Sequence, residues 1–177
     1  MRFRLSKNVF VMLGIASFVG CDQVTKVIAK ETLSTVAPLS FVNDMFRLTY
    51  AENTGVFLGM GKGLPEGVRF WLFTVAVGAV LMFILVDTLR RPNVDRWRLT
   101  AITMILAGGF GNLVDRVFND GVVIDFMNMG LGPLRTGIFN VADVFITFGA
   151  LLFLAVELTS GKESSDTETK RERTAEA

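Results

Sequence analysis

The stretch VRFWLFTVAVGAVLMFILV, at residues 68–86, contains a single charged side chain, Arg69. A helix needs about 20 consecutive, mainly apolar residues to cross the hydrocarbon core of a bilayer. The stretch therefore predicts a transmembrane helix. A hydrophobic content of 51% in the whole chain agrees with a membrane protein.

Three further stretches, residues 8–29, 99–116 and 138–157, are also apolar enough to span a bilayer, but each carries polar side chains at one end. Four spans use most of a chain of 177 residues, so we expect one membrane-embedded domain over residues 1–160. The predicted fold class is an all-α polytopic membrane protein with four transmembrane helices and a small extracytoplasmic β-rich segment.

The β-rich segment is expected in the two longer connections, at about 31–67 and 117–137. Apolar and polar side chains alternate in MFRLTYA at 45–51, and GVVIDF at 121–126 is a short apolar run, which are patterns typical of strands. The remaining residues, 161–177, are charged and almost without large apolar side chains, so we expect a disordered tail.

The orientation is predicted from lysine and arginine, which are retained on the cytoplasmic side of membrane proteins. Both termini and the connection between the second and third spans are rich in these residues, so both termini are predicted to be cytoplasmic. The polar ends of the spans then lie toward the outer face. The basic residues on the cytoplasmic side are Arg2, Arg4, Lys7, Arg90, Arg91, Arg96, Arg98, Lys162, Lys170, Arg171 and Arg173, against Lys30, Arg47, Lys62 and Arg135 on the other.

The sequence excludes several kinds of chemistry. It contains no histidine, which excludes histidine triads, histidine metal sites and imidazole acid–base catalysis. Cys21 is its one cysteine, which excludes an internal disulfide and a cysteine-rich zinc site. We expect neither a metal nor a cofactor, and the net charge of +1 gives no indication of nucleic acid binding.

Polar side chains share one face at the outer end of three predicted spans, because residues three or four apart lie on the same side of a helix. Ionisable groups inside a span are costly and usually mark function, so these faces predict one shared polar site. Asp143, about five residues into the fourth span, would lie roughly 7 to 8 Å below the helix start. The faces consist of Asp22 and Lys26; of Gly108, Asn112, Asp115 and Arg116; and of Asn140, Asp143 and Thr147.

Two carboxylates that share one proton can hydrolyse a peptide bond without histidine, cysteine or metal. Asp143 is the acid best placed for this role, and it needs a second carboxylate. Asp125 follows the apolar run at 122–124 and is the preferred partner. Asp115 remains the alternative, although Arg116 beside it indicates that Asp115 forms a structural ion pair. The spacing of Asp22 and Lys26 likewise indicates a structural ion pair.

Three rival interpretations have weaker support. A serine–lysine dyad would need Lys26 with Ser17, Ser34 or Ser40, none at a convincing spacing. The basic start and the apolar run up to Cys21 also look like a lipoprotein signal, but three further spans would remain unexplained. A transporter or channel would need polar groups along the whole depth of the membrane, whereas here they lie at one end.

Five strings in order along the chain resemble the lipoprotein signal peptidases, or signal peptidase II: DQVTK at 22–26, NTG at 53–55, GGFGNLVDR at 108–116, VVIDF at 122–126 and FNVAD at 139–143. The resemblance implies an aspartyl endopeptidase of the bacterial inner membrane. Such an enzyme uses an aspartate dyad and water to remove signal peptides from diacylglyceryl-modified prolipoproteins, cleaving before the lipidated cysteine.

The resemblance also implies roles for individual residues. Asp125 and Asp143 correspond to the catalytic dyad, and membrane lipids and the inhibitor globomycin are implied as partners. The family pattern after the NTG string differs from Val56, Phe57 and Leu58 of this chain. The residues implied to bind substrate or support the site are Asp22, Lys26, Asn53, Gly55, Gly108, Asn112, Asp115, Arg116, Asn140 and Ala142.

Overall fold

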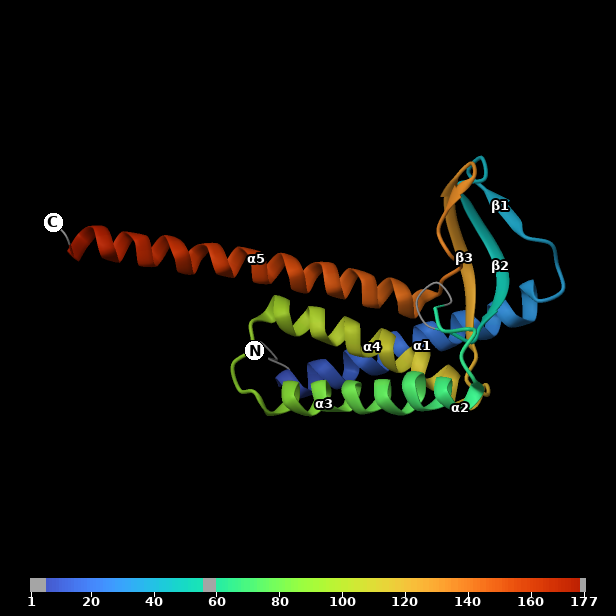
Figure 1. The fold of residues 1–177 in the computed structure, drawn as a ribbon, viewed down its shortest axis with the longest axis horizontal. Helices are drawn as coiled ribbons and strands as arrows, with labels where there is room; N and C mark the ends of the chain where they lie inside the picture. The colour runs from blue at the N-terminus through green and yellow to red at the C-terminus, as the bar shows by residue number, and fades with distance from the viewer. Residues whose placement is uncertain (1–5, 56–59, 176–177) are drawn as a thin grey trace, which may run out of the picture.

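The computed structural model describes residues 6–55 and 60–175, with side chains as far as Ser160. Four helices in the described part are long and apolar enough to cross a membrane, which confirms the predicted fold class. Figure 1 shows them side by side, with a small sheet standing across one end of the bundle. The helical elements are α1 (Lys7–Leu33), the continuous run of α2 (Glu66–Arg69), η1 (Phe70–Ala76) and α3 (Val77–Arg90), α4 (Arg96–Phe118), and α5 (Val141–Ala175).

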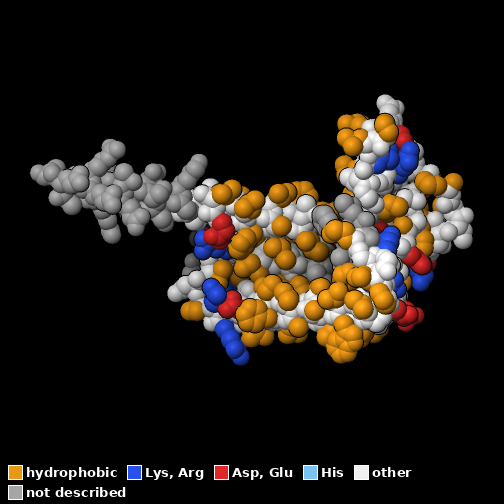
Figure 2. Space-filling model, in the orientation of Figure 1, with side chains coloured by type: hydrophobic (Ala, Val, Ile, Leu, Met, Phe, Trp, Pro, Cys, Tyr) orange, Lys and Arg blue, Asp and Glu red, His pale blue; other side chains and the backbone are white. Residues whose placement is uncertain are grey.

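Helix α4 is the central helix and packs against α1, α3 and α5. Half of its spanning window is buried inside the protein, against less than a fifth in each of the other three spans. Its glycines permit this close packing: a Cβ atom at Gly108 would lie 2.3 Å from the carbonyl oxygen of Ala142. Large apolar side chains on the outer helices, such as Phe83 and Trp71, are exposed, as expected for a surface in contact with lipid. Figure 2 shows hydrophobic side chains along the helices.

Helix α5 begins at Val141, three residues later than predicted. Phe139 is paired with Met127 through two backbone hydrogen bonds of 2.8 Å, so it belongs to the sheet and cannot start the helix. Asn140 caps the helix instead, because its Oδ1 accepts from the N–H of Asp143 at 3.0 Å and Asp143 Oδ2 accepts from the N–H of Asn140 at 3.2 Å. The predicted depth of Asp143 was therefore wrong: this residue lies in the first turn of α5.

Beyond the membrane span at Val141–Ser160, helix α5 continues to Ala175. Over residues 161–175 this course differs from the disorder that the composition predicts, and residues 176–177 lie outside the described residues. The segment is rich in glutamate, lysine and arginine, which have high helix propensity and can prolong a helix that is already nucleated.

The sheet contains four antiparallel strands in the order β1-β2-β3-β4. The strand-like patterns at 45–51 and 121–126 correspond to β2 (Phe46–Asn53) and β3 (Val123–Leu131), whereas β1 (Leu39–Phe41) and β4 (Leu134–Arg135) were not predicted. In the register, Ala51 is opposite Asp125 and Asn53 is opposite Val123. Because side chains alternate along a strand, Asn53 and Asp125 lie on the same face of the sheet.

A small apolar core attaches the sheet to the end of α1. Ala29 and Leu33 on α1 are buried against Phe126 of β3. Side chains of β2 and the first residue of α5 pack around this cluster, so strand β3, which carries Asp125, and the start of α5, which carries Asp143, share one support. The partly buried members are Leu48, Tyr50, Met127 and Val141.

Candidate active site

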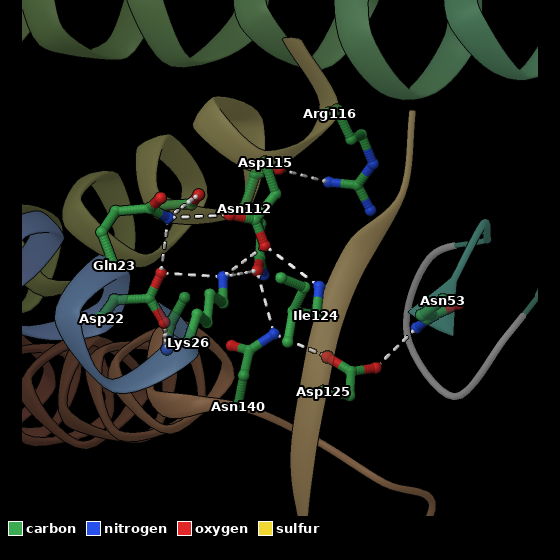
Figure 3. A network of polar contacts seen from close by, with 12 residues as sticks. Asp22, Gln23, Lys26, Asn53, Asn112, Asp115, Arg116, Ile124, Asp125 and Asn140 are labelled. Atoms are coloured by element: carbon green, nitrogen blue, oxygen red, sulfur yellow. Dashed lines mark hydrogen bonds and ion pairs between the residues drawn. The ribbon is translucent and has the colours of Figure 1, made fainter. Parts of the chain in front are cut away.

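Polar side chains from α1, β2, α4 and β3 converge with Asn140, the residue before α5, in one network (Figure 3). Asp125 and Asp143 both line a cavity of about 490 Å³ there. Asn112 and Thr147 line the same cavity, as the shared helix faces predicted. The structure thus brings together side chains from elements that are far apart in the sequence.

Asp125 is 2% exposed and is held by two asparagines. Its Oδ2 accepts from Asn53 Nδ2 at 3.0 Å, and its Oδ1 accepts from Asn140 Nδ2 at 2.7 Å. Burial first, and the negative charge of Asp143 second, raise the pKa of Asp125 to about 6. Asp125 therefore retains a proton at pH values at which an ordinary aspartate is ionised.

Asp143 is only partly buried, and its carboxylate also has two donors. Its Oδ1 accepts from Asn112 Nδ2 at 2.9 Å, and its Oδ2 accepts from the backbone N–H of Asn140 at 3.2 Å. Asn140 thus donates to both carboxyl groups, from its side chain to Asp125 and from its backbone to Asp143. This asparagine fixes the two acids relative to one another.

Lys26 is the centre of a buried ion cluster beside the two acids. Its Nζ lies 2.8 Å from Asp22 Oδ2 and 2.9 Å from Asp115 Oδ2, and it donates to Asn112 Oδ1 at 3.0 Å. The expected pair of Asp22 and Lys26 is confirmed. The expected ion pair of Asp115 with Arg116 is wrong, because the helix turns Asp115 toward Lys26 on α1.

The two carboxylates of this cluster each hold the backbone directly before a candidate catalytic aspartate. Asp22 Oδ1 accepts from the N–H of Ala142 at 2.8 Å, and Asp115 Oδ2 accepts from the N–H of Ile124 at 3.1 Å. Since Lys26 pairs with both carboxylates, one lysine couples the start of α5 to strand β3. The cluster therefore positions the two acids without touching the cavity between them.

Arg116 ties the segment after β2 to the site. Its Nη2 donates to the carbonyl oxygen of Gly55 at 3.0 Å, and its Nη1 donates to that of Asn112 at 3.3 Å. The N–H of Gly55 in turn donates to Asn53 Oδ1 at 3.0 Å, which orients the side chain that contacts Asp125. Val56, Phe57 and Leu58, where the sequence departs from the family pattern, lie outside the described residues.

Two contributors were missed by the sequence analysis. Gln23 Nε2 donates to Asp115 Oδ1 at 2.8 Å and to the carbonyl oxygen of Gly111 at 3.1 Å, and its position beside Asp22 was the available signal. Asn128 is buried and accepts from Arg135 at 2.6 Å. Asn128 lies on the side of β3 that also carries two buried residues. This alternation could have indicated a buried polar contact.

The rival serine–lysine dyad is not compatible with the structure. Lys26 is 1% exposed and its ammonium group is occupied by two carboxylates and an amide. Ser17, Ser34 and Ser40 are all exposed. The three N–H groups of the Lys26 ammonium are thus already paired, which leaves none for a serine hydroxyl.

The raised pKa of Asp125 predicts a pH dependence of stability. Between about pH 4 and pH 6 the folded protein binds a proton that the unfolded chain has released. This contribution, about 3 kcal/mol at most, is complete below the unfolded pKa and is lost as the pH rises through about 6. We expect the thermal midpoint in detergent to fall over this range in the wild type and to fall less in Asp125→Asn. If the thermal midpoints of the two proteins changed with pH in the same way, the raised pKa of Asp125 would be contradicted.

Comparisons with known proteins indicate the same family as the five sequence strings. The family model of signal peptidase (SPase) II matches residues 14–159. The lipoprotein signal peptidase of Borrelia turicatae (strain 91E135) is 30% identical over 170 residues, which cover 93% of this chain and 97% of the relative. That of Chlorobium phaeovibrioides (strain DSM 265 / 1930) is 37% identical over 149 residues, covering 79% and 85%.

Two solved structures, both described as bacterial membrane enzymes studied by the in meso method, have a similar fold. The structure at 2.3 Å resolution has a TM-score of 0.76 and 25% sequence identity, and the match covers 87% of this chain and 90% of the other. The structure at 1.9 Å resolution has a TM-score of 0.71 and 26% identity, covering 84% and 92%.

Proposed function

Because the chain belongs to the signal peptidase II family, aspartic-type membrane peptidases that remove signal peptides from prolipoproteins, we propose that Asp125 and Asp143 form its catalytic pair. We further propose that it cleaves diacylglyceryl-modified prolipoproteins before the lipidated cysteine. The observation that carries the assignment is that both carboxyl groups line one cavity and are bridged by Asn140.

In the proposed mechanism the two acids share one proton. The ionised carboxylate removes a proton from water, whose oxygen attacks the carbonyl carbon of the scissile peptide bond, while the protonated carboxyl donates to the carbonyl oxygen. A proton then passes to the nitrogen of the cysteine residue, the C–N bond breaks, and the signal peptide leaves with a new carboxylate. The raised pKa of Asp125 supports this residue as the holder of the shared proton at rest.

The surrounding residues are proposed to keep the two acids in place. Asn53, Asn112 and Asn140 donate to the carboxyl groups directly. The others act through the backbone, either by holding it, as Asp22 does at Ala142, or by permitting the close approach of α4 and α5. The residues proposed to act in this indirect way are Asp22, Lys26, Gly55, Gly108, Asp115, Arg116 and Ala142.

We propose that both termini are cytoplasmic and that the site faces the outer side of the membrane. Figure 1 shows the start of α1 and the α3–α4 connection at one end of the bundle, with α5 extending beyond that same end, and the sheet at the other end. The first end carries Lys7 and the arginines at 90–98, which agrees with the positive-inside rule. The cavity would then open near the outer interface, where an acylated cysteine lies and water is available.

The test is cleavage of a diacylglyceryl-modified prolipoprotein by the purified protein in detergent, with a chelator present. The same prolipoprotein without the lipid is the matched control. We expect cleavage of the lipidated form alone, before the modified cysteine, and inhibition by globomycin. Equal cleavage of both forms would contradict the proposed substrate class, and an inert protein would contradict the proposed function.

A further inference from the structure

We propose that Arg135, on β4, is a substrate-binding residue that determines specificity, and that its Nη2 donates a hydrogen bond to a carbonyl oxygen of the lipidated substrate. The inference rests on the proposed function, because it names the part of the proposed prolipoprotein substrate that the cavity wall at Arg135 recognises. Arg135 lines the same cavity as Asp125 and Asp143. It is outside the hydrogen-bond network that holds the two acids.

The guanidinium group of Arg135 is held in one orientation by two neighbours. Its Nε donates to Asn128 Oδ1 at 2.6 Å, and its Nη1 donates to the carbonyl oxygen of Asp44 at 2.8 Å. Asn128 is itself fixed, because its Nδ2 donates to the carbonyl oxygen of Thr136 at 2.7 Å. An arginine held in this way is preorganised for a ligand, since little side-chain entropy remains to be lost on binding.

The third nitrogen of the group, Nη2, is buried and has no hydrogen-bond partner within residues 6–55 and 60–160. A buried donor without a partner is unfavourable, and in native proteins such groups commonly meet a ligand or water. Since the side chain borders the cavity, a bound substrate that displaces the atoms covering Nη2 can bring an oxygen atom to it. The unpaired donor is therefore the observation that carries the inference.

The surroundings of Arg135 favour an uncharged acceptor on an apolar molecule. The side-chain oxygen Oδ2 of Asp44 lies 3.3 Å from Arg135 Nη1, so this carboxylate already balances part of the charge of the guanidinium group. Hydrogen bonds from Arg47 and Ser40 hold the pKa of Asp44 well below its usual range, so this carboxylate stays ionised. Figure 2 shows acidic and basic side chains together near the tip of the sheet, with hydrophobic ones around them.

The other walls of the cavity indicate which molecule brings the acceptor. Met129, Ile138, Val144 and Phe148 line the cavity together with Arg135, so a carbonyl group attached to an apolar chain fits this wall. On the proposed substrate, two groups provide such an oxygen: the ester carbonyl of an acyl chain, and the backbone carbonyl on the mature side of the scissile bond.

The test compares Arg135→Met with Arg47→Met in the cleavage assay. Arg47 is the matched control, because it is also an arginine paired with Asp44, but it does not line the cavity. A hydrogen bond from a charged donor corresponds to about a tenfold to hundredfold change in binding. We expect Arg135→Met to raise KM by about this factor with kcat within about twofold, and Arg47→Met to leave both unchanged.

A second substrate separates the two acceptors in the wild-type protein, whose folding is not in question. In a dialkyl ether analogue of the lipidated prolipoprotein, the ester carbonyls are absent. If the ester is the acceptor, the analogue raises the KM of the wild type and leaves that of Arg135→Met unchanged. If the backbone carbonyl is the acceptor, the analogue leaves the wild-type KM unchanged, while Arg135→Met still has a raised KM on both substrates.

Several outcomes would overturn the inference. These are a wild-type KM in Arg135→Met, an equal effect of Arg47→Met, or a fall in kcat with KM unchanged. Should Arg135→Met not fold, Arg135→Lys keeps a cation beside Asp44 but has no counterpart of Nη2. A wild-type KM in this variant would overturn the inference as well. If the wild type does not cleave the lipidated substrate at all, the proposed function fails instead.

Discussion

Replacing either Asp125 or Asp143 by asparagine is expected to reduce kcat for the lipidated prolipoprotein by about 1,000-fold or more. One carboxyl group must accept a proton from water while the other donates to the carbonyl oxygen, and a single general acid or base contributes roughly 100- to 10,000-fold. Asparagine keeps the size of the side chain but can neither accept nor release the proton. The measurement is single-turnover cleavage in detergent, with a chelator present throughout.

Asp120→Asn is the matched control for these two variants. Asp120 lies between α4 and β3, is exposed and has a φ of 52°, a conformation that asparagine also adopts readily. This variant should cleave at the wild-type rate. Cleavage within about tenfold of the wild type by folded Asp125→Asn or Asp143→Asn would refute the proposed dyad, and Asp115 would then be the acid to test.

Lys26→Met is expected to have the largest effect on stability, a loss of about 3–5 kcal/mol in the free energy of unfolding. Methionine is similar in length, but it leaves the buried carboxylates of Asp22 and Asp115 without their cation. Each of these carboxylates holds the backbone before a candidate catalytic aspartate, so kcat should fall as well. Denaturant or thermal unfolding of the purified protein in detergent measures the loss.

Lys30→Met is the control for this variant, because Lys30 lies one helical turn farther along α1 and is exposed. Its substitution should change the stability by less than about 0.5 kcal/mol. If Lys26→Met were as stable as Lys30→Met, the ion cluster would not support the site, and the position of Asp125 and Asp143 would have to depend on the apolar core and on Asn140.

Helices and strands were largely predictable because the signals for them are local. The stretch at 68–86 is apolar throughout, and the cost of exposing backbone polar groups to lipid leaves a helix as the only state available to it. The alternation at 45–51 similarly predicted β2. The start of α5 was not predictable, because it depends on the pairing of Phe139 with Met127 on a strand that precedes it by several residues.

The candidate site was predictable only in part. Asp22 and Lys26 could be paired from the sequence, since residues four apart lie on one face of a helix. The partner of Asp115 could not: its neighbour Arg116 was the obvious choice, yet the carboxylate meets Lys26 from another helix. The place of Asn128 in the β3 alternation indicated only a buried polar contact, and its partner Arg135 could not be predicted, because their contact depends on the course of the β3–β4 connection.

By itself, the sequence determined that this protein is a four-helix membrane protein with polar groups at one end, because hydropathy and helical periodicity are properties of short segments. Only the tertiary structure decided which polar groups meet. Asp125 is joined to Asn53 and Asn140 across separations of 72 and 15 residues, and Lys26 is joined to Asn112 across 86. Such contacts arise from the packing of helices and the register of strands, which no local pattern encodes.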